Sequence, residues 1–292
     1  MLSKFRIGSR MVLVGALGVL ALSACAKKDG LQIAVQERPV EAIYSAGASR
    51  LDDRKWVEAV QYFQEVERQH PYSEWSRRSI LMTAYAHYEG NAYEEARADA
   101  DRFISLYPGS PSAAYAYYIK SICYFEQIID VGRDQAATEQ ALAALREVVR
   151  RYPTTEYATD ARLKLDMVND QLAGKEMAIG RWYLRQNMPL VAIGRFKTVV
   201  DRYQTTSHTA EALYRLVEVY LTLGLDEEAK RNAAVLGFNY PGDGWYSEAY
   251  SLMSGKGLQP AVAPRNAAKR GMMKLPTVRM PKLPSILKPP TA

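Results

Sequence analysis

A five-fold internal repeat constrains the fold of this chain more than any other feature of its 292-residue sequence. Each copy is marked by a short phrase: an aromatic residue or histidine, then proline (glutamine once), then residues typical of turns and helix N-caps. The phrases begin at His70, Tyr107, Tyr152, Tyr203 and Tyr240. Because proline cannot continue an α-helix, and Ser, Thr and Asp cap the next one, each phrase predicts a boundary between two helices.

Three columns of small and apolar residues precede each phrase at fixed distances. Twelve residues before the second position of the phrase, all five copies have alanine. Apolar residues stand eight and five residues before the same position, so offsets of four and three place the columns on one face of a helix. The columns are Ala59, Ala96, Ala141, Ala192 and Ala229; Phe63, Ala100, Leu145, Phe196 and Ala233; and Val66, Phe103, Val148, Val199 and Leu236. We expect this face to be buried, with the alanines where helices approach closely.

A second amphipathic stretch lies upstream of each of these helices. The five stretches span residues 40–51, 75–90, 112–127, 175–185 and 209–223. Gly47, Trp56, Ala59, Phe63 and Pro71 follow the tetratricopeptide pattern in register, and the units therefore resemble tetratricopeptide repeats. Units of this kind bury their apolar faces on their neighbours. The expected fold is an all-α tetratricopeptide-repeat superhelix of about five helix–turn–helix units.

The repeats divide the chain into segments. We expect a signal peptide over 1–24, a lipidated linker over 25–39, N-terminal repeats over 40–173, C-terminal repeats with a capping helix over 174–254, and a basic, Pro-rich tail over 255–292. A long helix over 155–172 should join the third unit to the fourth, with a slight hinge at the junction, and 245–253 should form the capping helix. The tail is expected to be disordered or in polyproline II conformation, because proline at this density blocks helix and sheet.

The first 25 residues have the layout of an export signal. Three basic residues precede an apolar run over 11–22, which is too short to span a bilayer of roughly 30 Å. The run closes on Leu-Ser-Ala-Cys, ending at Cys25, which resembles the lipobox of bacterial lipoproteins. The resemblance implies cleavage before Cys25, lipidation of its sulfur, and, with Ala26 rather than Asp following, transfer to the outer membrane. The alternative is a plain signal peptide with an incidental cysteine.

Charge is distributed unevenly along the chain. The formal net charge of +6 includes +3 from residues 1–24 and +8 from residues 256–292, so residues 25–255 carry −5. A basic tail on a mildly acidic body is weak evidence for nucleic-acid binding, and export makes that partner improbable. The tail is either a solvated spacer or a segment that binds an acidic partner or an anionic lipid surface.

We find no motif that points to catalysis, to a metal or to a cofactor. The three histidines, His70, His87 and His208, are scattered, and no P-loop, nucleophile elbow or dinucleotide fingerprint occurs. Cys123 lies in an apolar helical stretch and is expected to be a buried small hydrophobe rather than a reactive thiol. The sequence therefore favours a protein that is not an enzyme, and an enzyme of peptidoglycan metabolism is a remote alternative.

The first helix of each tetratricopeptide unit lines the concave face of such arrays, which gives candidate binding residues. Tyrosine dominates these positions in the first three units, and it suits an extended or aromatic-ended peptide because it offers a large contact area and a polar tip. The candidate peptide groove contains Tyr44, Arg78, Tyr85, Tyr88, Tyr115 and Tyr118. The alternative is that about half of these rings pack between units.

The lipobox, the five repeats and the recurring Tyr-Pro-x-Ser/Thr phrase together resemble the BamD family, lipoprotein subunits of the complex that folds β-barrels into the outer membrane. The resemblance implies that the N-terminal repeats receive unfolded barrel proteins or their targeting peptides. It also implies that the C-terminal repeats hold the periplasmic domains of the barrel-forming subunit, beside other assembly lipoproteins, with Arg195 in that contact. Gln204 departs from the expected proline. The main alternative is a lipid-anchored secretin pilot or cell-envelope scaffold with the same fold.

Overall fold

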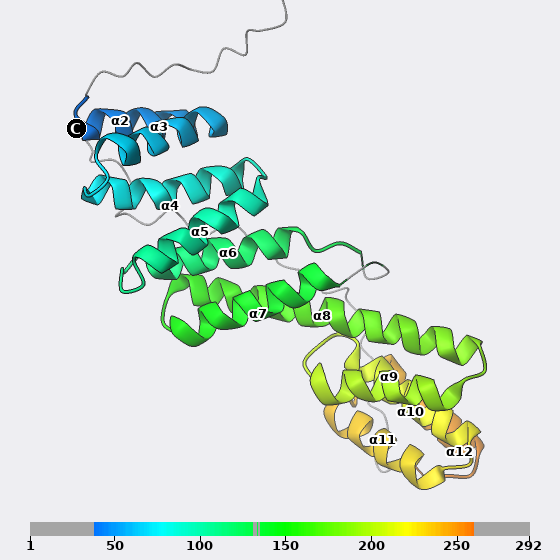
Figure 1. The fold of residues 1–292 in the computed structure, drawn as a ribbon. Helices are drawn as coiled ribbons and strands as arrows, with labels where there is room; N and C mark the ends of the chain where they lie inside the picture. Colours follow the sequence, from blue (N-terminus) through cyan, green and yellow to red (C-terminus); the bar gives the residue numbers. More distant parts are fainter. Residues whose placement is uncertain (1–37, 131–132, 134, 260–292) are drawn as a thin grey trace, which may run out of the picture. The chain divides into compact units, whose positions relative to one another are not determined.

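The computed structural model describes residues 38–130, 133 and 135–259, and their regular secondary structure is entirely helical (Figure 1). The helices are α2 (Val40–Asp52), α3 (Trp56–Gln69), α4 (Glu74–Glu89), α5 (Tyr93–Leu106), α6 (Ala113–Glu126), α7 (Ala136–Arg151), α8 (Glu156–Arg185), α9 (Pro189–Arg202), α10 (Thr209–Thr222), α11 (Asp226–Asn239) and α12 (Gly244–Gly255). Cys25 and nearly all of the tail lie outside the described residues.

Each helix from α2 to α11 packs against the next one in the chain, and the first helices of neighbouring hairpins also touch (Figure 1). Thus α2 contacts α4, α4 contacts α6, and α6 contacts α8. Stacked helical hairpins that contact only near neighbours are the arrangement of a tetratricopeptide array, which confirms the predicted fold class. None of the helices among the described residues is long and apolar enough to cross a membrane.

The three sequence columns form the buried face of the second helix in each hairpin. All fifteen side chains are buried, and the five alanines have no exposed surface. Gly47 and Gly180 face the rings of Phe63 and Phe196, where an added Cβ would lie 2.8 and 2.5 Å from a ring carbon. A large ring in one helix of the hairpin thus fills the space left by glycine in the other.

The phrase folds into the same turn in all five copies. In each one the backbone N–H of the fourth residue donates to the carbonyl of the first, as from Ser73 to His70 and from Thr206 to Tyr203. Ser73, Thr155 and Asp243 also cap the following helix through side-chain oxygens. The copy with Gln204 makes the same turn, so the missing proline does not alter the fold there.

Helix α8 differs from what the sequence predicts. Separate helices were expected over 155–172 and 175–185, but Glu156–Arg185 is one continuous helix of 30 residues. Two buried apolar clusters share it: one ends with Val168 and Leu172, and the other begins with Ala173 and Met177. Gly174 is buried here and does not break the helix. The division at 173/174 and the slight hinge remain predictions.

The predicted capping helix over 245–253 is confirmed as α12. It packs against α10 and α11, and Tyr246, Ala249 and Met253 are fully buried. Trp245 stacks on Tyr214 of α10 with ring centroids 5.1 Å apart. The last hairpin is therefore covered on its outer side.

Candidate binding surfaces

Three of the six predicted groove residues lie in the core. Tyr44, Tyr115 and Tyr118 have no exposed surface. The ring of Tyr44 lies 5.4 Å from Phe63 and 4.8 Å from Trp75, and Tyr115 and Tyr118 both pack on Tyr157. The expectation that they line an open surface is wrong for these three, because successive units approach so closely that the rings fill the space between them.

The hydroxyl of Tyr118 belongs to a buried polar group that sequence reasoning missed. It donates to Asp160 Oδ2 at 2.5 Å, and Lys164 Nζ donates to the same oxygen at 2.7 Å. Lys164 is only 3% exposed and lies over the rings of Tyr118 and Phe125. Burial and the bond to Asp160 raise the pKa of Tyr118 far above its ordinary value. This group ties α6 to α8.

Tyr85, Tyr88 and Arg78 remain partly accessible along α4. Burial, followed by the nearby Glu89 carboxylate, raises the pKa of Tyr85 to about 12. Tyr88 Oη lies 3.5 Å from Glu126 Oε1 on α6. Arg78 donates to Glu74 at 2.9 Å and lies over the ring of Trp75. These three are the predicted groove residues that keep exposed surface.

Carboxylates end the first helix of each of the first three hairpins. Asp52, Glu89 and Glu126 are the last residues of α2, α4 and α6, and we call these three residues the acidic edge. Tyr85 is close enough to Asp52 and Glu89, and Tyr88 to Glu89 and Glu126, for the carboxylates to raise the pKa of each phenol in addition to burial. The sequence did hold a signal for this edge: an acid stands nineteen residues before both Pro71 and Pro108.

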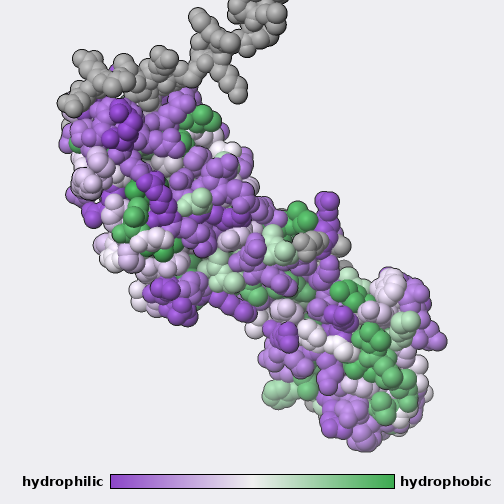
Figure 2. Space-filling model, in the orientation of Figure 1, coloured by the Kyte–Doolittle hydropathy of each residue, from purple (hydrophilic) through white to green (hydrophobic). Residues whose placement is uncertain are grey.

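The C-terminal hairpins present a different surface. Arg195 on α9 donates to Glu176 of α8 at 3.2 Å and keeps 42% of its side chain exposed. One turn earlier, Met188, Leu190 and Val191 are exposed apolar residues at the start of α9. In the view of Figure 2, hydrophobic residues are more prominent over the C-terminal helices than over the first hairpins. An exposed charge beside an apolar patch is the composition of a protein-binding surface.

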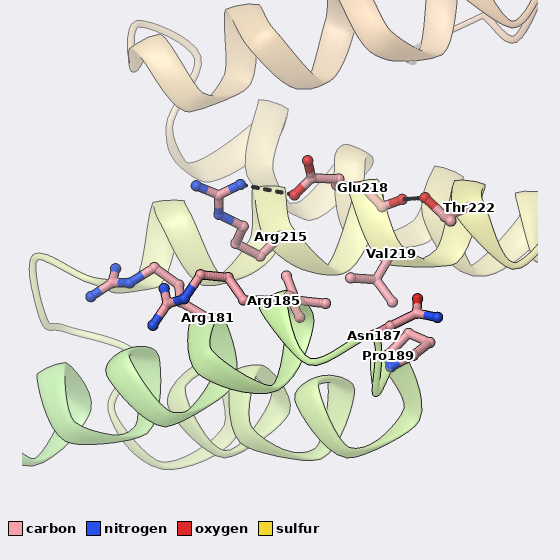
Figure 3. A pocket seen from close by; sticks show the side chains of 9 residues that line it. Arg181, Arg185, Asn187, Pro189, Arg215, Glu218, Val219 and Thr222 are labelled. Carbon is pink, nitrogen blue, oxygen red and sulfur yellow. Dashed lines mark hydrogen bonds and ion pairs between the residues drawn. The ribbon is translucent and has the colours of Figure 1, made fainter.

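A basic pocket of about 430 Å³ lies between the end of α8 and α10. Arg181 and Arg185 enter it from α8 and Arg215 from α10 (Figure 3). Arg181 donates to both oxygens of Glu211 at 3.0 Å, and Arg215 pairs with Glu218 at 2.9 Å. The pocket is therefore a network of ion pairs with Arg185 at its exposed side.

The described residues include no group of His, Cys, Asp and Glu that could hold a metal ion. Cys123 is fully buried, as expected, and burial raises the pKa of its thiol to about 12. A protonated, inaccessible thiol is a poor nucleophile. His87 contacts Asp99 at 2.7 Å within its own hairpin, which is a structural pair between α4 and α5.

Comparison with known proteins identifies the family. The family model YfiO, described as an outer membrane lipoprotein, matches residues 36–236. Outer membrane protein assembly factor BamD of Caulobacter vibrioides is 67% identical over 275 residues, covering 94% of this chain and 90% of the relative. BamD of Rickettsia prowazekii is 45% identical, covering 80% and 92%. A solved tetratricopeptide protein of Thermus thermophilus aligns with 74% of this chain and all of its own, at 17% identity and a TM-score of 0.35, too low to support an argument. The identities of 67% and 45% to the two BamD proteins extend over most of the chain, which folds as an array of helical hairpins. The chain therefore belongs to the BamD family of outer membrane protein assembly factors.

Proposed function

We propose that this chain is a non-catalytic lipoprotein subunit that binds unfolded β-barrel proteins with its N-terminal repeats and the barrel-forming assembly subunit with its C-terminal repeats. The observation that carries the proposal is the presence of two chemically different surfaces on one array. Accessible tyrosines lie on α4, beside the carboxylates that end α2, α4 and α6, and Arg195 lies on α9 beside exposed apolar residues.

The N-terminal surface suits an extended polypeptide. Tyr85 and Tyr88 offer ring faces and hydroxyls one helical turn apart, and their neighbours Tyr44, Tyr115 and Tyr118 hold the hairpins rigidly together. A rigid aromatic surface binds an extended or targeting peptide with little loss of side-chain entropy. Arg78, at the opposite end of α4, supplies a cation for acidic groups of the same ligand.

The C-terminal surface suits a folded partner. Met188, Leu190 and Val191 form the apolar part, and Arg195 supplies a charge that acidic partner residues can recognise. Lipidation of Cys25 would hold both surfaces at the periplasmic face of the outer membrane, because each buried lipid methylene contributes about 0.8 kcal/mol. Other assembly lipoproteins would join through the same complex.

Affinity purification of the tagged full chain from detergent-solubilised membranes, followed by mass spectrometry, tests this function. We expect a large barrel protein with periplasmic domains to be recovered, and Arg195→Glu to reduce its recovery. Arg231→Glu is the matched control, because Arg231 is also an exposed, ion-paired arginine of the C-terminal hairpins. Recovery of a secretin, or of no barrel protein, would contradict the proposal.

A further inference from the structure

The acidic edge places three carboxylates where helix electrostatics disfavours them. The C-terminus of a helix carries partial negative charge, so cations are favoured there and acids are disfavoured. Nevertheless α2, α4 and α6 end in Asp52, Glu89 and Glu126. Within the described residues none of the three pairs with a lysine or arginine, although the adjacent Asp53 does pair with Arg50.

The turn itself does not require an acid at this position. Arg54, Asn91, Asn187 and Gly224 occupy the same left-handed position of four turns, with φ between 56° and 72°. Two residues earlier stand Asp52 and Glu89 in the N-terminal hairpins but Arg185 and Thr222 in the C-terminal ones. Because the same backbone accepts Arg or Thr, the turn does not explain Asp52 and Glu89.

A second observation at the same place points to a ligand. Tyr115 is fully buried, and its hydroxyl is without a hydrogen-bond partner in the part of the chain that the structure describes. Tyr85, Tyr157, Glu89 and Tyr88 all act electrostatically on this hydroxyl, so it lies near the two accessible tyrosines and one carboxylate of the acidic edge. An unpaired buried hydroxyl is destabilising, and a bound donor would remove that cost.

We propose that the acidic edge and the Tyr85–Tyr88–Tyr115 cluster receive a lysine or arginine side chain of the extended polypeptide that the N-terminal repeats bind. The inference rests on the proposed function and specifies its ligand. The three carboxylates and the three helix C-termini attract the cation, the tyrosine rings contact its aliphatic stem, and a phenol oxygen accepts a hydrogen bond from it. An acidic side chain at this place is repelled by the same groups.

The test is a peptide-binding measurement on the purified full chain. Three fluorescein-labelled ten-residue peptides of alternating Val and Tyr differ only at one central residue, which is Lys, norleucine or Glu. We expect the Lys peptide to bind about tenfold more tightly than the Glu peptide at low salt, and the difference to shrink as salt increases. Glu89→Gln with Glu126→Gln should abolish the preference, and Glu95→Gln, an exposed acid in the first turn of α5, should leave it unchanged.

Tyr115→Phe separates the ligand role from a packing role. The substitution removes only an unpaired hydroxyl, so the fold should be retained, while the Lys peptide should lose affinity several-fold and the Glu peptide should not. Equal affinity for all three peptides, with binding lost in Tyr88→Ala, overturns this inference and keeps the proposed function. If none of the peptides binds, both fail.

A crosslinking experiment identifies the occupant. With p-benzoylphenylalanine in place of Tyr93, whose ring lies 6.0 Å from that of Tyr88, the Lys peptide should crosslink to the chain on illumination. Crosslinks to the chain's own basic segment 260–292 in place of the peptide would overturn the proposal, because the occupant would then be the tail.

Discussion

The N-terminal and C-terminal hairpins build the same turn and place opposite chemistry on it. At the position two residues before the left-handed residue, the N-terminal hairpins have Asp52 and Glu89, and the fourth has Arg185. One residue after the left-handed residue, the N-terminal hairpins have Lys55 and Ala92, whereas the C-terminal hairpins have the larger apolar residues Met188 and Leu225. The backbone is set by the buried columns and the turn, which leaves these exposed positions free to diverge. The difference shows how one repeat can carry two chemically different surfaces.

The largest effect is expected from the two glycines that face phenylalanine rings. Gly47 faces Phe63 of the first apolar cluster and Gly180 faces Phe196 of the second, and Val at either site would overlap the ring. Overpacking of this kind costs about 1–3 kcal/mol of unfolding free energy. Urea denaturation followed by circular dichroism and by reaction of the Cys123 thiol measures it.

The Cys123 thiol reports on unfolding of the N-terminal hairpins, because Cys123 lies in the first apolar cluster. The urea concentration at which the thiol becomes exposed should therefore fall more in Gly47→Val than in Gly180→Val. Equal exposure in both variants would show that the two clusters unfold as one cooperative unit. The regions would then differ in surface chemistry and not in stability.

An exchange of edge charges is expected to have the next largest effect. Glu89→Arg should weaken binding of the Lys peptide about tenfold, because it places a cation beside Tyr85 and Tyr88. Arg185→Glu, the reverse change at the equivalent position, should leave peptide affinity unaltered. Fluorescence anisotropy measures both, and a comparable loss in the Arg185 variant would break the assignment of separate ligands to the two regions.

Alkaline pH is expected to weaken the N-terminal hairpins. The pKa of Tyr85 is raised from 10 to about 12 in the folded chain, so its contribution is complete below pH 10. Between pH 10 and 12 the unfolded chain releases this proton and the folded chain retains it, so the free energy of unfolding falls as pH rises. Urea titrations at pH 9 and 11 measure this loss, which should be smaller in Tyr85→Phe. A Tyr85→Phe variant with the wild-type loss would contradict the prediction.

Local patterns predicted most of the fold because each hairpin buries the same face. The alanine column identified the buried helix in all five copies, and the phrase identified the turn that follows each of these helices, including the one with Gln204. The continuity of α8 was missed because glycine disfavours a helix interior, whereas Gly174 is buried within one continuous helix.

The candidate site was less predictable than the fold. The register of the repeat places Tyr44, Tyr115 and Tyr118 on the face predicted to line the groove, but it does not give how closely neighbouring hairpins approach. That distance decides whether a ring lines a groove or fills a gap. The acidic edge was missed because the repeat is marked by buried apolar columns, whereas Asp52 is exposed and Glu89 half-buried, and acids of this kind are common on helix surfaces.

The continuous helix α8 also has a geometric consequence for how such a protein can change over evolution. One residue inserted near Ala173 would rotate everything that follows by about 100° and shift it by about 1.5 Å. An insertion of four residues would rotate it by a net angle of only about 40°, with a shift of about 6 Å. The number of residues in α8 therefore sets the angle between the two surfaces proposed to bind the polypeptide and the partner, and insertions or deletions in this one helix can reorient them without altering either surface.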